Sequence, residues 1–308
     1  MSQSVRRLGR SLRHQGNLQI MALFGVIALL VFNIAPLVGL QIAFKDYKFN
    51  LGIWGSPWVG LKHFESIYRD INIWPILRNT LALSCIKTFL IFPLPVLLAV
   101  LLNECMCNWF KRVVQTVSYF PYFISWPIVA LLAMNWLSPT SGFINSALVS
   151  IGLLDQPYFF LGEESAFWWV SLGLEIWKNV GYSSIIYLAA ITGVDQEALE
   201  AAVIDGANRF QRIWYVTIPT ILPTVMIMLI LSIGSLMGGA NFQVSYTLGN
   251  TLNYNTSEII DTYVLTLGIE MSRFSYSTAI SLLNSLVSAV LLVSANRLSS
   301  LLTGESLF

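Results

Sequence analysis

Few residues of this 308-residue chain have the types and spacing that catalysis or metal binding requires. The histidines His14 and His63 lie far apart, and the three cysteines, Cys85, Cys105 and Cys107, include a single Cys-x-Cys pair. A structural zinc site needs about four such ligands, so neither set predicts a metal centre, and we expect reduced cysteines. The chain also lacks a Gly-x-x-x-x-Gly-Lys-Ser/Thr phosphate loop and any nucleophile–base pattern. The sequence therefore predicts no catalytic residue and no ATPase activity in this chain.

Residues 193–219 are better suited to binding another protein. Good helix formers occupy 197–204, and Gly206 can adopt the left-handed conformation that ends a helix. Ala201 and Ala202 give this helix a small-residue surface that a partner can approach closely, and Phe210 adds a large apolar anchor. Four carboxylates lie in the same stretch, those of Asp195, Glu197, Glu200 and Asp205.

Polar side chains interrupt two apolar runs, and these could line a path for a polar solute. Residues 167–191 contain Glu175, Lys178, Asn179, Tyr182, Ser183, Ser184 and Tyr187. Residues 220–240 contain Ser232, Gly234, Ser235, Gly238 and Gly239 and lead into Asn241 and Gln243. A charge at the centre of a membrane helix costs roughly 2.5–3.5 kcal/mol, so such groups face protein or water. Neutral hydroxyl, amide and aromatic groups suit a carbohydrate, although Gly and Ser also serve helix packing.

The charged groups in these runs have expected partners. Glu175 and Lys178 are three residues apart on one helix, and we expect them to pair. Lys87, in the run 76–102, is expected either to reach the membrane interface or to meet an acidic group. If Lys87 faces the cavity, it would read an acidic sugar.

The composition places these residues in a membrane protein. Hydrophobic residues make up 56% of the chain and charged residues 11%, with a mean hydropathy of +0.68. A soluble domain has about 25% charged residues, and a disordered chain has low hydrophobicity, so both classes are excluded. Aromatic residues at 13% suit two lipid–water interfaces. The net charge of +1 argues against a nucleic-acid partner.

The apolar runs predict an all-α membrane protein with six transmembrane helices in one domain, residues 1–308. A span needs about 20 apolar residues, and six runs qualify: residues 20–44, 76–102, 113–137, 167–191, 220–240 and 278–296. The first run follows a basic tail, 1–17, but it is longer than a signal-peptide core, and the segment after it lacks a small-residue cleavage site. We therefore expect it to remain as a span.

The Lys and Arg content of the loops sets the expected orientation. Four arginines precede the first span, and six crossings return the C-terminus to the same side, so both termini are expected in the cytoplasm. Residues 103–112 and 193–219 are then cytoplasmic, and residues 138–166, which lack Lys and Arg, lie outside. The first outer loop, 45–75, departs from this charge rule because it carries Lys45, Lys48, Lys62 and Arg69. We expect it to be a partly helical, aromatic flap, with a second short amphipathic piece at 145–154.

Prolines within the spans predict bends. Each removes a backbone donor and can kink a helix, and neighbouring helices can satisfy the freed groups. The prolines concerned are Pro36, Pro93, Pro95, Pro121 and Pro127. Bent helices suit a moving protein, although the prolines could also shape static packing.

The loop 193–219 resembles a known motif. Glu200-Ala201-Ala202, then Gly206, then Val216-Thr217-Ile218-Pro219 is similar to the EAA loop of permease subunits of binding-protein-dependent ATP-binding cassette (ABC) importers. The family pattern usually ends Ile-x-Leu-Pro, so Val216 and Ile218 depart from it conservatively. Residues 260–263, 275–279, 295–298 and 304–308 resemble the sugar-importing branch, and more narrowly its oligosaccharide and polysaccharide members.

This resemblance implies a type I ABC importer permease fold in the bacterial inner membrane. It implies a second, similar permease as heterodimer partner, two cytoplasmic ATPase subunits that bind ATP and Mg²⁺, and an extracytoplasmic sugar-binding protein. The loop would form a coupling helix that sits in a groove of the ATPase, with Glu200 pairing with a basic group. The residues expected to couple to the ATPase are Glu200, Ala201, Ala202, Asp205, Gly206 and Phe210. By similarity to the larger permease of the maltose transporter, the expected substrate-path residues are Asn179, Gly181, Tyr182, Ser235 and Asn241, and we add Ser183.

Two other functions stay open from the residues. An ion-coupled secondary sugar transporter would need membrane-embedded charged relays and inverted hydropathy repeats, and only Glu175 with Lys178 fits. A membrane enzyme acting on lipid-linked sugars would need an acidic cluster at one interface, which Asp195, Glu197, Glu200 and Asp205 could form.

Overall fold

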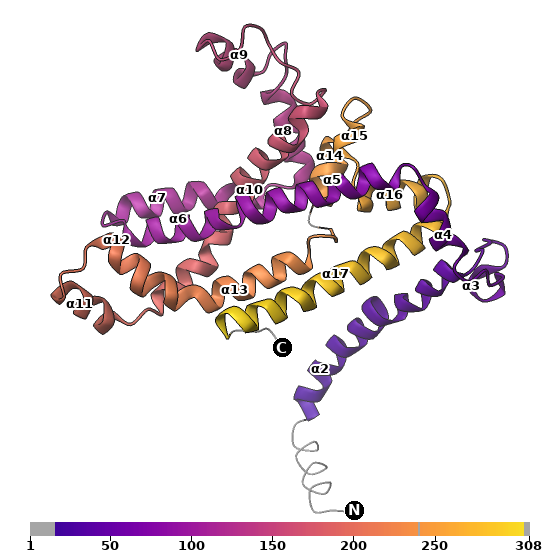
Figure 1. The fold of residues 1–308 in the computed structure, drawn as a ribbon, viewed down its shortest axis with the longest axis horizontal. Coiled ribbons are helices and arrows are strands. Elements are labelled where there is room, and N and C mark those ends of the chain that lie inside the picture. Colours follow the sequence, from indigo (N-terminus) through magenta and orange to yellow (C-terminus); the bar gives the residue numbers. More distant parts are fainter. Residues whose placement is uncertain (1–15, 240, 305–308) are drawn as a thin grey trace, which may run out of the picture. The chain divides into compact units, whose positions relative to one another are not determined.

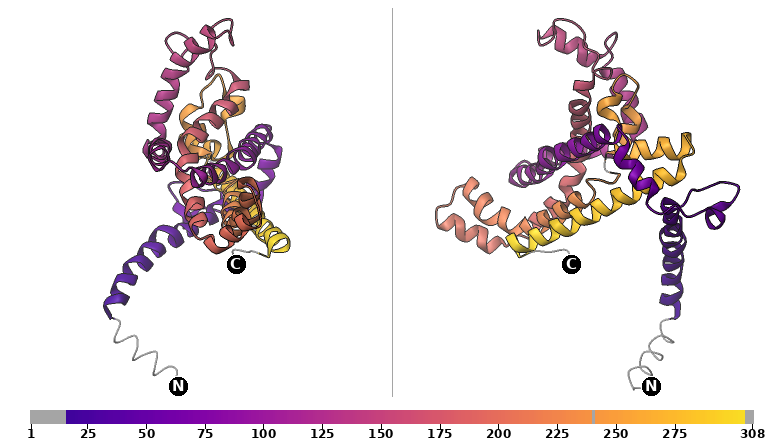
Figure 2. Two further views of the ribbon diagram at one scale, coloured as in Figure 1. Left: turned by 90° about the vertical axis from the view of Figure 1, so that its left-hand side faces the viewer. Right: turned by 45° about the vertical axis from the view of Figure 1, so that its right-hand side comes forward.

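The computed structural model describes residues 16–239 and 241–304. The N-terminal arginines, His14 and most of the family-like ending 304–308 lie outside the described residues. Within the described ranges the regular structure is helical, without a strand, and one isolated antiparallel bridge joins Lys45 and Trp58 (Figures 1 and 2). The all-α prediction is confirmed for this part of the chain.

The helices follow one another with short connections. In the first half they are α2 (Gly16–Leu29), η1 (Leu30–Ile34), η2 (Ala35–Phe44), α3 (Gly52–Gly55), α4 (Lys62–Arg69), α5 (Ile73–Ile86), η3 (Lys87–Ile91), α6 (Pro93–Glu104), α7 (Asn108–Tyr119), η4 (Phe120–Phe123), α8 (Trp126–Trp136) and α9 (Phe143–Ser150). The second half contains α10 (Glu164–Thr192), α11 (Gln196–Ile204), α12 (Arg209–Arg212), η5 (Ile213–Thr217), α13 (Ile218–Gly234), α14 (Phe242–Leu248), α15 (Tyr254–Ser257), α16 (Ile260–Leu265), η6 (Thr266–Glu270) and α17 (Phe274–Thr303). The short helices α3, α4 and α9 confirm that the predicted flap and the second short piece are partly helical, and their place outside the membrane stays a prediction.

Consecutive helices join into long apolar rods. Four of these are long and apolar enough to cross a membrane: Met21–Phe44, Ile73–Glu104, Arg209–Gly234 and Phe274–Leu301. A fifth candidate is the pair Asn108–Phe123 and Trp126–Trp136, which is bent by 105°. The predicted run 220–240 is displaced, because the helix already begins at Arg209 and ends at Gly234, before the glycines of the following turn.

The bend between α7–η4 and α8 has a local cause. Pro121 and Pro127 each stand in the first turn of a helical segment, where the missing N–H costs little. Ile124 and Ser125 between them have extended backbone conformations, with ψ of 129° and 150°. The predicted proline bend is confirmed here, and it frees carbonyl groups at the end of η4.

Helix α10 covers the predicted run 167–191 and is the longest packing element of its unit. Its 29 residues span about 43 Å. Hydropathy alone does not select it as a span, because Glu175, Lys178 and Asn179 lie near its middle.

Packing divides the chain into two compact units, and each is described by itself. The first contains Met1–Ile67 and Leu267–Leu282, and the second contains Tyr68–Thr266 and Leu283–Phe308. In the first unit Ser275 joins the two segments, since its hydroxyl donates to the Lys45 carbonyl (2.6 Å) and accepts from the Tyr47 N–H (2.9 Å). The Lys45 ammonium is buried, donates to the Ile53 carbonyl (2.8 Å) and lies 4.9 Å from the centre of the Trp58 ring.

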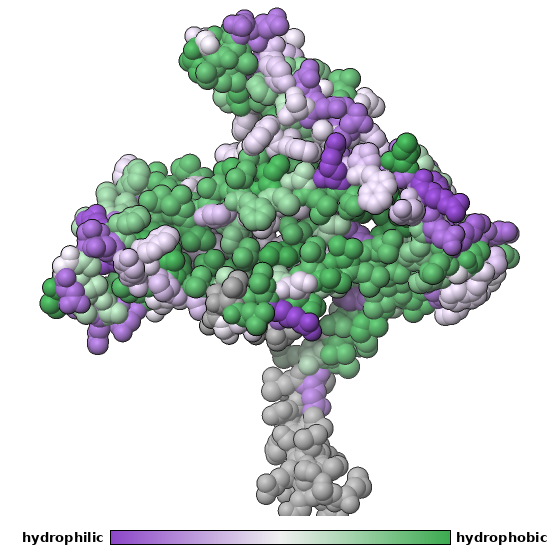
Figure 3. All heavy atoms as spheres, viewed as in Figure 1, coloured by the Kyte–Doolittle hydropathy of each residue, from purple (hydrophilic) through white to green (hydrophobic). Residues whose placement is uncertain are grey.

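The second unit has two hydrophobic cores that share α10. One core packs α10 through Phe167 and Leu174 against α5, α8 and α14. The other packs Tyr187 and Ile191 of α10 against α6 and α13. Apolar side chains cover the rods of this unit, and hydrophilic side chains gather at the end formed by α11 and α12 (Figure 3).

Candidate functional site

The helix predicted in the loop after α10 is α11. Asp195 precedes its first residue as the N-cap, and the Asp195 carboxylate accepts the backbone N–H of Glu197 (2.9 Å). Such a side-chain cap satisfies one of the donors that a helix start leaves open. The predicted helical range 197–204 is confirmed, with one further residue at its start.

The end of α11 follows the predicted glycine. Gly206 has φ of +80°, a left-handed conformation that residues with a Cβ adopt only at a cost. The Gly206 N–H donates to the Val203 carbonyl (3.0 Å), and the Ala207 N–H donates to the Ala202 carbonyl (2.9 Å). These two bonds form the Schellman motif, which closes the last turn. Ala202 and Gly206 of the EAA-like pattern therefore both take part in this motif, Ala202 through Ala207 and Gly206 through Val203.

The next helix, α12, follows directly after its N-cap residue Asn208. Asn208 and Gln211 form a reciprocal capping box, in which each side chain accepts the other residue's backbone N–H (2.9 and 2.8 Å). From Arg209 the chain continues as helix to Gly234. Defined turns thus connect α11 to α10 on one side and to a 26-residue rod on the other.

The surface of this segment is open and partly apolar. Glu200, Ala201 and Asp205 are exposed and Ala202 is half-buried. Ile204 is 86% exposed and Phe210 is 72% exposed. Phe210 stacks on Trp214 with a centroid distance of 6.4 Å, and Tyr215 is exposed beside it. The structure brings the six predicted coupling residues onto one segment. Trp214 and Tyr215 were not singled out from the sequence, although this aromatic pair directly precedes Val216 of the motif and could have indicated a further part of the surface.

The charged groups in the middle of α10 have partners other than the expected ones. The Glu175 carboxylate pairs with the Lys87 ammonium (3.0 Å) through one oxygen and accepts from the Asn179 amide through the other. The predicted Glu175–Lys178 ion pair is therefore wrong, and the alternative that Lys87 meets an acidic group is confirmed. The Lys178 ammonium donates instead to the carbonyls of Tyr122 (2.7 Å), Pro121 (3.5 Å) and Ile124. Lys178 turns to this bend because the carbonyls of Tyr122 and Ile124 have no backbone partner there among the described residues, whereas the Pro121 carbonyl also accepts the Ile124 N–H.

Two polar hollows meet at Asn179. We call the first the ion-pair hollow; its volume is about 330 Å³, and its polar lining includes Lys87, Glu175, Asn179, Ser183, Ser232 and Ser235. We call the second the aromatic hollow; its volume is about 590 Å³, and Lys178 and Asn179 line it together with Tyr122, Trp126, Phe242 and Tyr246. The predicted path residues Asn179, Ser183 and Ser235 are thus brought together.

The other three predicted path residues lie in packing contacts. Gly181 is buried where α10 approaches α7, and a Cβ on it would lie 2.0 Å from the Ser118 carbonyl oxygen. Tyr182 stacks on Tyr122 with a centroid distance of 3.8 Å. Asn241 is buried and donates to the Ser84 hydroxyl (3.2 Å). Contact of these residues with a solute stays a prediction.

A turn follows α13 and is held from several sides. Ser84 donates to the Leu236 carbonyl (2.5 Å), and the Asn284 amide donates to the Met237 carbonyl. The Gly239 N–H donates to the Asp261 carboxylate (2.7 Å). Burial raises the pKa of the Asp261 carboxyl, and this hydrogen bond opposes the rise. These hydrogen bonds give the non-helical backbone of the turn its partners within the protein.

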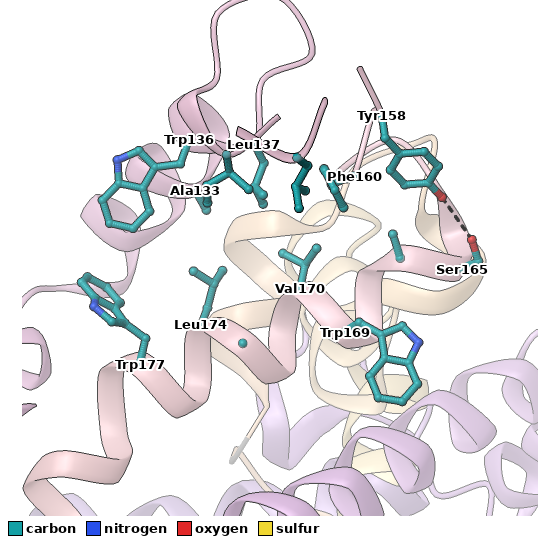
Figure 4. Close-up of a pocket in the computed structure, with 14 residues that line it drawn as sticks. Ala133, Trp136, Leu137, Tyr158, Phe160, Ser165, Trp169, Val170, Leu174 and Trp177 are labelled. Atoms are coloured by element: carbon teal, nitrogen blue, oxygen red, sulfur yellow. Dashed lines mark hydrogen bonds between the residues drawn. The ribbon is translucent and has the colours of Figure 1, made fainter. Parts of the chain in front are cut away.

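A third hollow, the tryptophan hollow, has a different lining. It encloses about 570 Å³ between α8, α9 and the first half of α10, with Trp136, Trp169 and Trp177 among its walls (Figure 4). The hydroxyl oxygens of Tyr158 and Ser165, which also line this hollow, lie 3.5 Å apart. It holds no charged group, unlike the two hollows at Asn179.

Comparison with known proteins agrees with the motif. Residues 91–303 match the family described as "binding-protein-dependent transport system inner membrane component". The polygalacturonan/rhamnogalacturonan transport system permease protein YteP of Bacillus subtilis (strain 168) is 41% identical over 305 residues, which cover 98% of this chain and 94% of that protein.

Solved structures extend the similarity to the fold. A chain from a bacterial ABC transporter involved in the import of the acidic polysaccharide alginate is 34% identical, with a TM-score of 0.89, over 96% of this chain and 99% of that one. A chain from a bacterial alginate ABC transporter in complex with an alginate pentasaccharide-bound periplasmic protein matches with the same TM-score of 0.89 and 34% identity, over 98% and 100% of the two chains.

Proposed function

The chain belongs to the family of binding-protein-dependent transport system inner membrane components, so it is a multi-pass membrane permease subunit of an ABC sugar transport system, and we propose that it passes an oligosaccharide into the cell. In this proposal it has six spans with both termini in the cytoplasm of a bacterial inner membrane. α10, with its polar middle, is counted as a span beside the bent pair α7–α8. ABC permeases are not themselves enzymes.

The coupling role of α11 carries the proposal. α11 is short, capped at both ends and joined by hydrogen-bonded turns to two long helices. A stiff connection transmits displacement, whereas a flexible loop would absorb it. The exposed side chains of Ile204 and Phe210 offer a partner an apolar contact surface, and the exposed Glu200 offers a negative charge. We assign this surface to an ATPase subunit.

The assembly follows from this assignment. The chain pairs with a second, similar permease and with two ATPase subunits, which bind ATP and Mg²⁺. An extracytoplasmic binding protein delivers the sugar. ATP binding draws the ATPases together, α11 follows, and the bent spans expose the central hollows first to one side and then to the other. The names of the relatives, one for a polygalacturonan system and two for alginate systems, support an oligosaccharide as the solute.

The family membership weighs against the two alternatives left open by the residues. An ion-coupled transporter would not need an exposed, doubly capped helix beside a long span. An enzyme acting on lipid-linked sugars would use clustered carboxylates, but the Asp195 carboxylate caps α11, and Asp205 stands at the helix end.

Reconstitution tests the proposed function. The chain, expressed together with a candidate second permease, an ATPase and a sugar-binding protein, should co-purify as a complex and take up oligosaccharide into proteoliposomes only with ATP. Phe210→Glu should release the ATPase from the permease pair, because it places a charge in the apolar contact. Phe143→Glu is the matched control, since Phe143 is 60% exposed on the short helix α9, and it should leave the ATPase bound. An ATPase that stays bound to the Phe210→Glu variant would refute the assignment.

A further inference from the structure

The middle of α10 carries more positive than negative charge. Lys178 lies at the midpoint of α10 and is 6% exposed, and Lys87 approaches the same region from η3. Glu175 is the carboxylate between them, and Lys87 and Asn179 occupy its two oxygens. Within the described part of the chain, no carboxylate lies within ion-pair distance of the Lys178 ammonium. One positive charge is therefore left uncompensated.

The partners of Lys178 hold the ammonium in place without neutralising it. Carbonyl oxygens from the bend before α8 accept its hydrogen bonds. The rings of Tyr122 and Trp126 lie 5.5 and 5.7 Å from it. Dipoles and ring faces stabilise a cation, but they carry no net charge. A charge kept at this depth is costly and marks a functional site more often than a packing solution.

The lining of the aromatic hollow fits a sugar ring that bears an anion. Phe242 and Tyr246 stack nearly parallel, with centroids 5.3 Å apart, and Tyr246 is 59% exposed. Their faces and the ring of Tyr122 offer apolar surface to a pyranose, while the Asn179 amide and the hydroxyl of Thr247 offer hydrogen bonds. Lys178 lines the same hollow.

We propose that the aromatic hollow receives a carboxylate-bearing sugar of the transported chain, and that Lys178 makes the subunit select acidic over neutral oligosaccharides. This inference rests on the proposed function as an oligosaccharide permease. Lys178 acts through its charge, and the carbonyls at the bend fix its position.

The test compares a short oligogalacturonate with its methyl ester, which lacks the negative charges and carries one methyl group more on each carboxyl. Binding to the purified permease–ATPase complex, without binding protein, is followed by fluorescence quenching of the tryptophans. The wild type should bind the free acid more tightly than the ester. Lys178→Gln keeps a donor for the carbonyls and removes the charge; it should weaken binding of the free acid about tenfold or more and leave the ester nearly unchanged. Lys178→Arg should retain the preference.

The control removes a lysine that lines neither hollow at Asn179. Lys111→Gln takes one positive charge from α7, and the preference for the acid should persist. Equal binding of acid and ester to the wild type would overturn the inference. A Lys178→Gln variant that retains the preference would also overturn it. Equal loss of affinity for both probes in this variant would overturn it too, because a lysine with a purely structural role predicts that result. Absence of ATP-dependent uptake of any oligosaccharide, measured separately, would instead count against the proposed function.

Discussion

The α11 segment and the middle of α10 are neighbours in sequence but are determined by different contacts. The hydrogen bonds that shape α11 join residues within five positions of one another, from the Asp195 cap to the turn at Gly206. In the middle of α10, Glu175 reaches Lys87, and Lys178 reaches carbonyls more than fifty residues away. The surface that we propose for an ATPase partner is thus specified locally, whereas the proposed solute path is assembled from distant helices. The predictions below test this difference.

The largest effect is expected at Gly206. Gly206→Pro forces φ from +80° to about −65° and removes the N–H that closes the last turn, at a cost of about 3 kcal/mol or more. ATP-dependent uptake in proteoliposomes should fall about a hundredfold while the subunits still co-purify.

Helix α9 provides a matched control for this change. It ends in the same motif, with Gly152 at φ +73° and with N–H groups of Gly152 and Leu153 donating to Val149 and Leu148 (3.0 Å each). Gly152→Pro should disturb α9 equally but leave uptake near the wild-type rate. Similar losses in both variants would mean that general destabilisation, and not coupling, explains Gly206.

The second effect concerns helix contact in the α10 region. Gly181→Ala places a Cβ 2.0 Å from the Ser118 carbonyl oxygen, so α7 and α10 must separate. We expect a loss of about 2–3 kcal/mol in the free energy of unfolding, measured by denaturant titration in detergent. Gly173→Ala, on the same helix with no atom within 4 Å, should be neutral or slightly stabilising. If the two variants unfold alike, the close approach of α7 is not what Gly181 supplies.

The third effect is the loss of one member of the buried ion pair. Glu175→Gln removes the carboxylate partner of Lys87, whose side chain is 28% exposed, and should lower the free energy of unfolding by about 2 kcal/mol. The double variant Lys87→Met/Glu175→Gln should recover most of this loss. Thermal unfolding of the purified subunit measures both; additive losses would show that the two residues do not interact.

The smallest effect is expected at the start of α11. Asp195→Ala removes the cap on the Glu197 N–H and should cost about 1 kcal/mol locally. Amide hydrogen exchange in the first turn of α11 should become about fivefold faster, with no change in α10. Asp195→Ser keeps an acceptor and should exchange like the wild type. Faster exchange along α10 as well would mean that the two regions are less independent than their contacts indicate.

The same difference explains what could be predicted from the sequence. The range of α11, its end at Gly206 and the bend near Pro121 depend on local residue types, and these predictions are confirmed. The partner of Glu175 was predicted incorrectly because i, i+3 spacing favours Lys178, whereas the choice depends on where η3 and the bend before α8 lie. The end of the rod Arg209–Gly234 was misplaced because hydropathy continues through the turn that follows it.

The polar middle of α10 also bears on how the protein enters the bilayer during synthesis. Insertion of α10 alone would carry Glu175 and Lys178 into lipid at a cost of several kcal/mol. Lys87 and the carbonyls before α8 precede α10 in the chain, so the groups that stabilise both charges have already been made when α10 leaves the ribosome. The partners of both charges are therefore synthesised before α10 itself. We expect α10 to insert into the bilayer together with the earlier helices and not on its own.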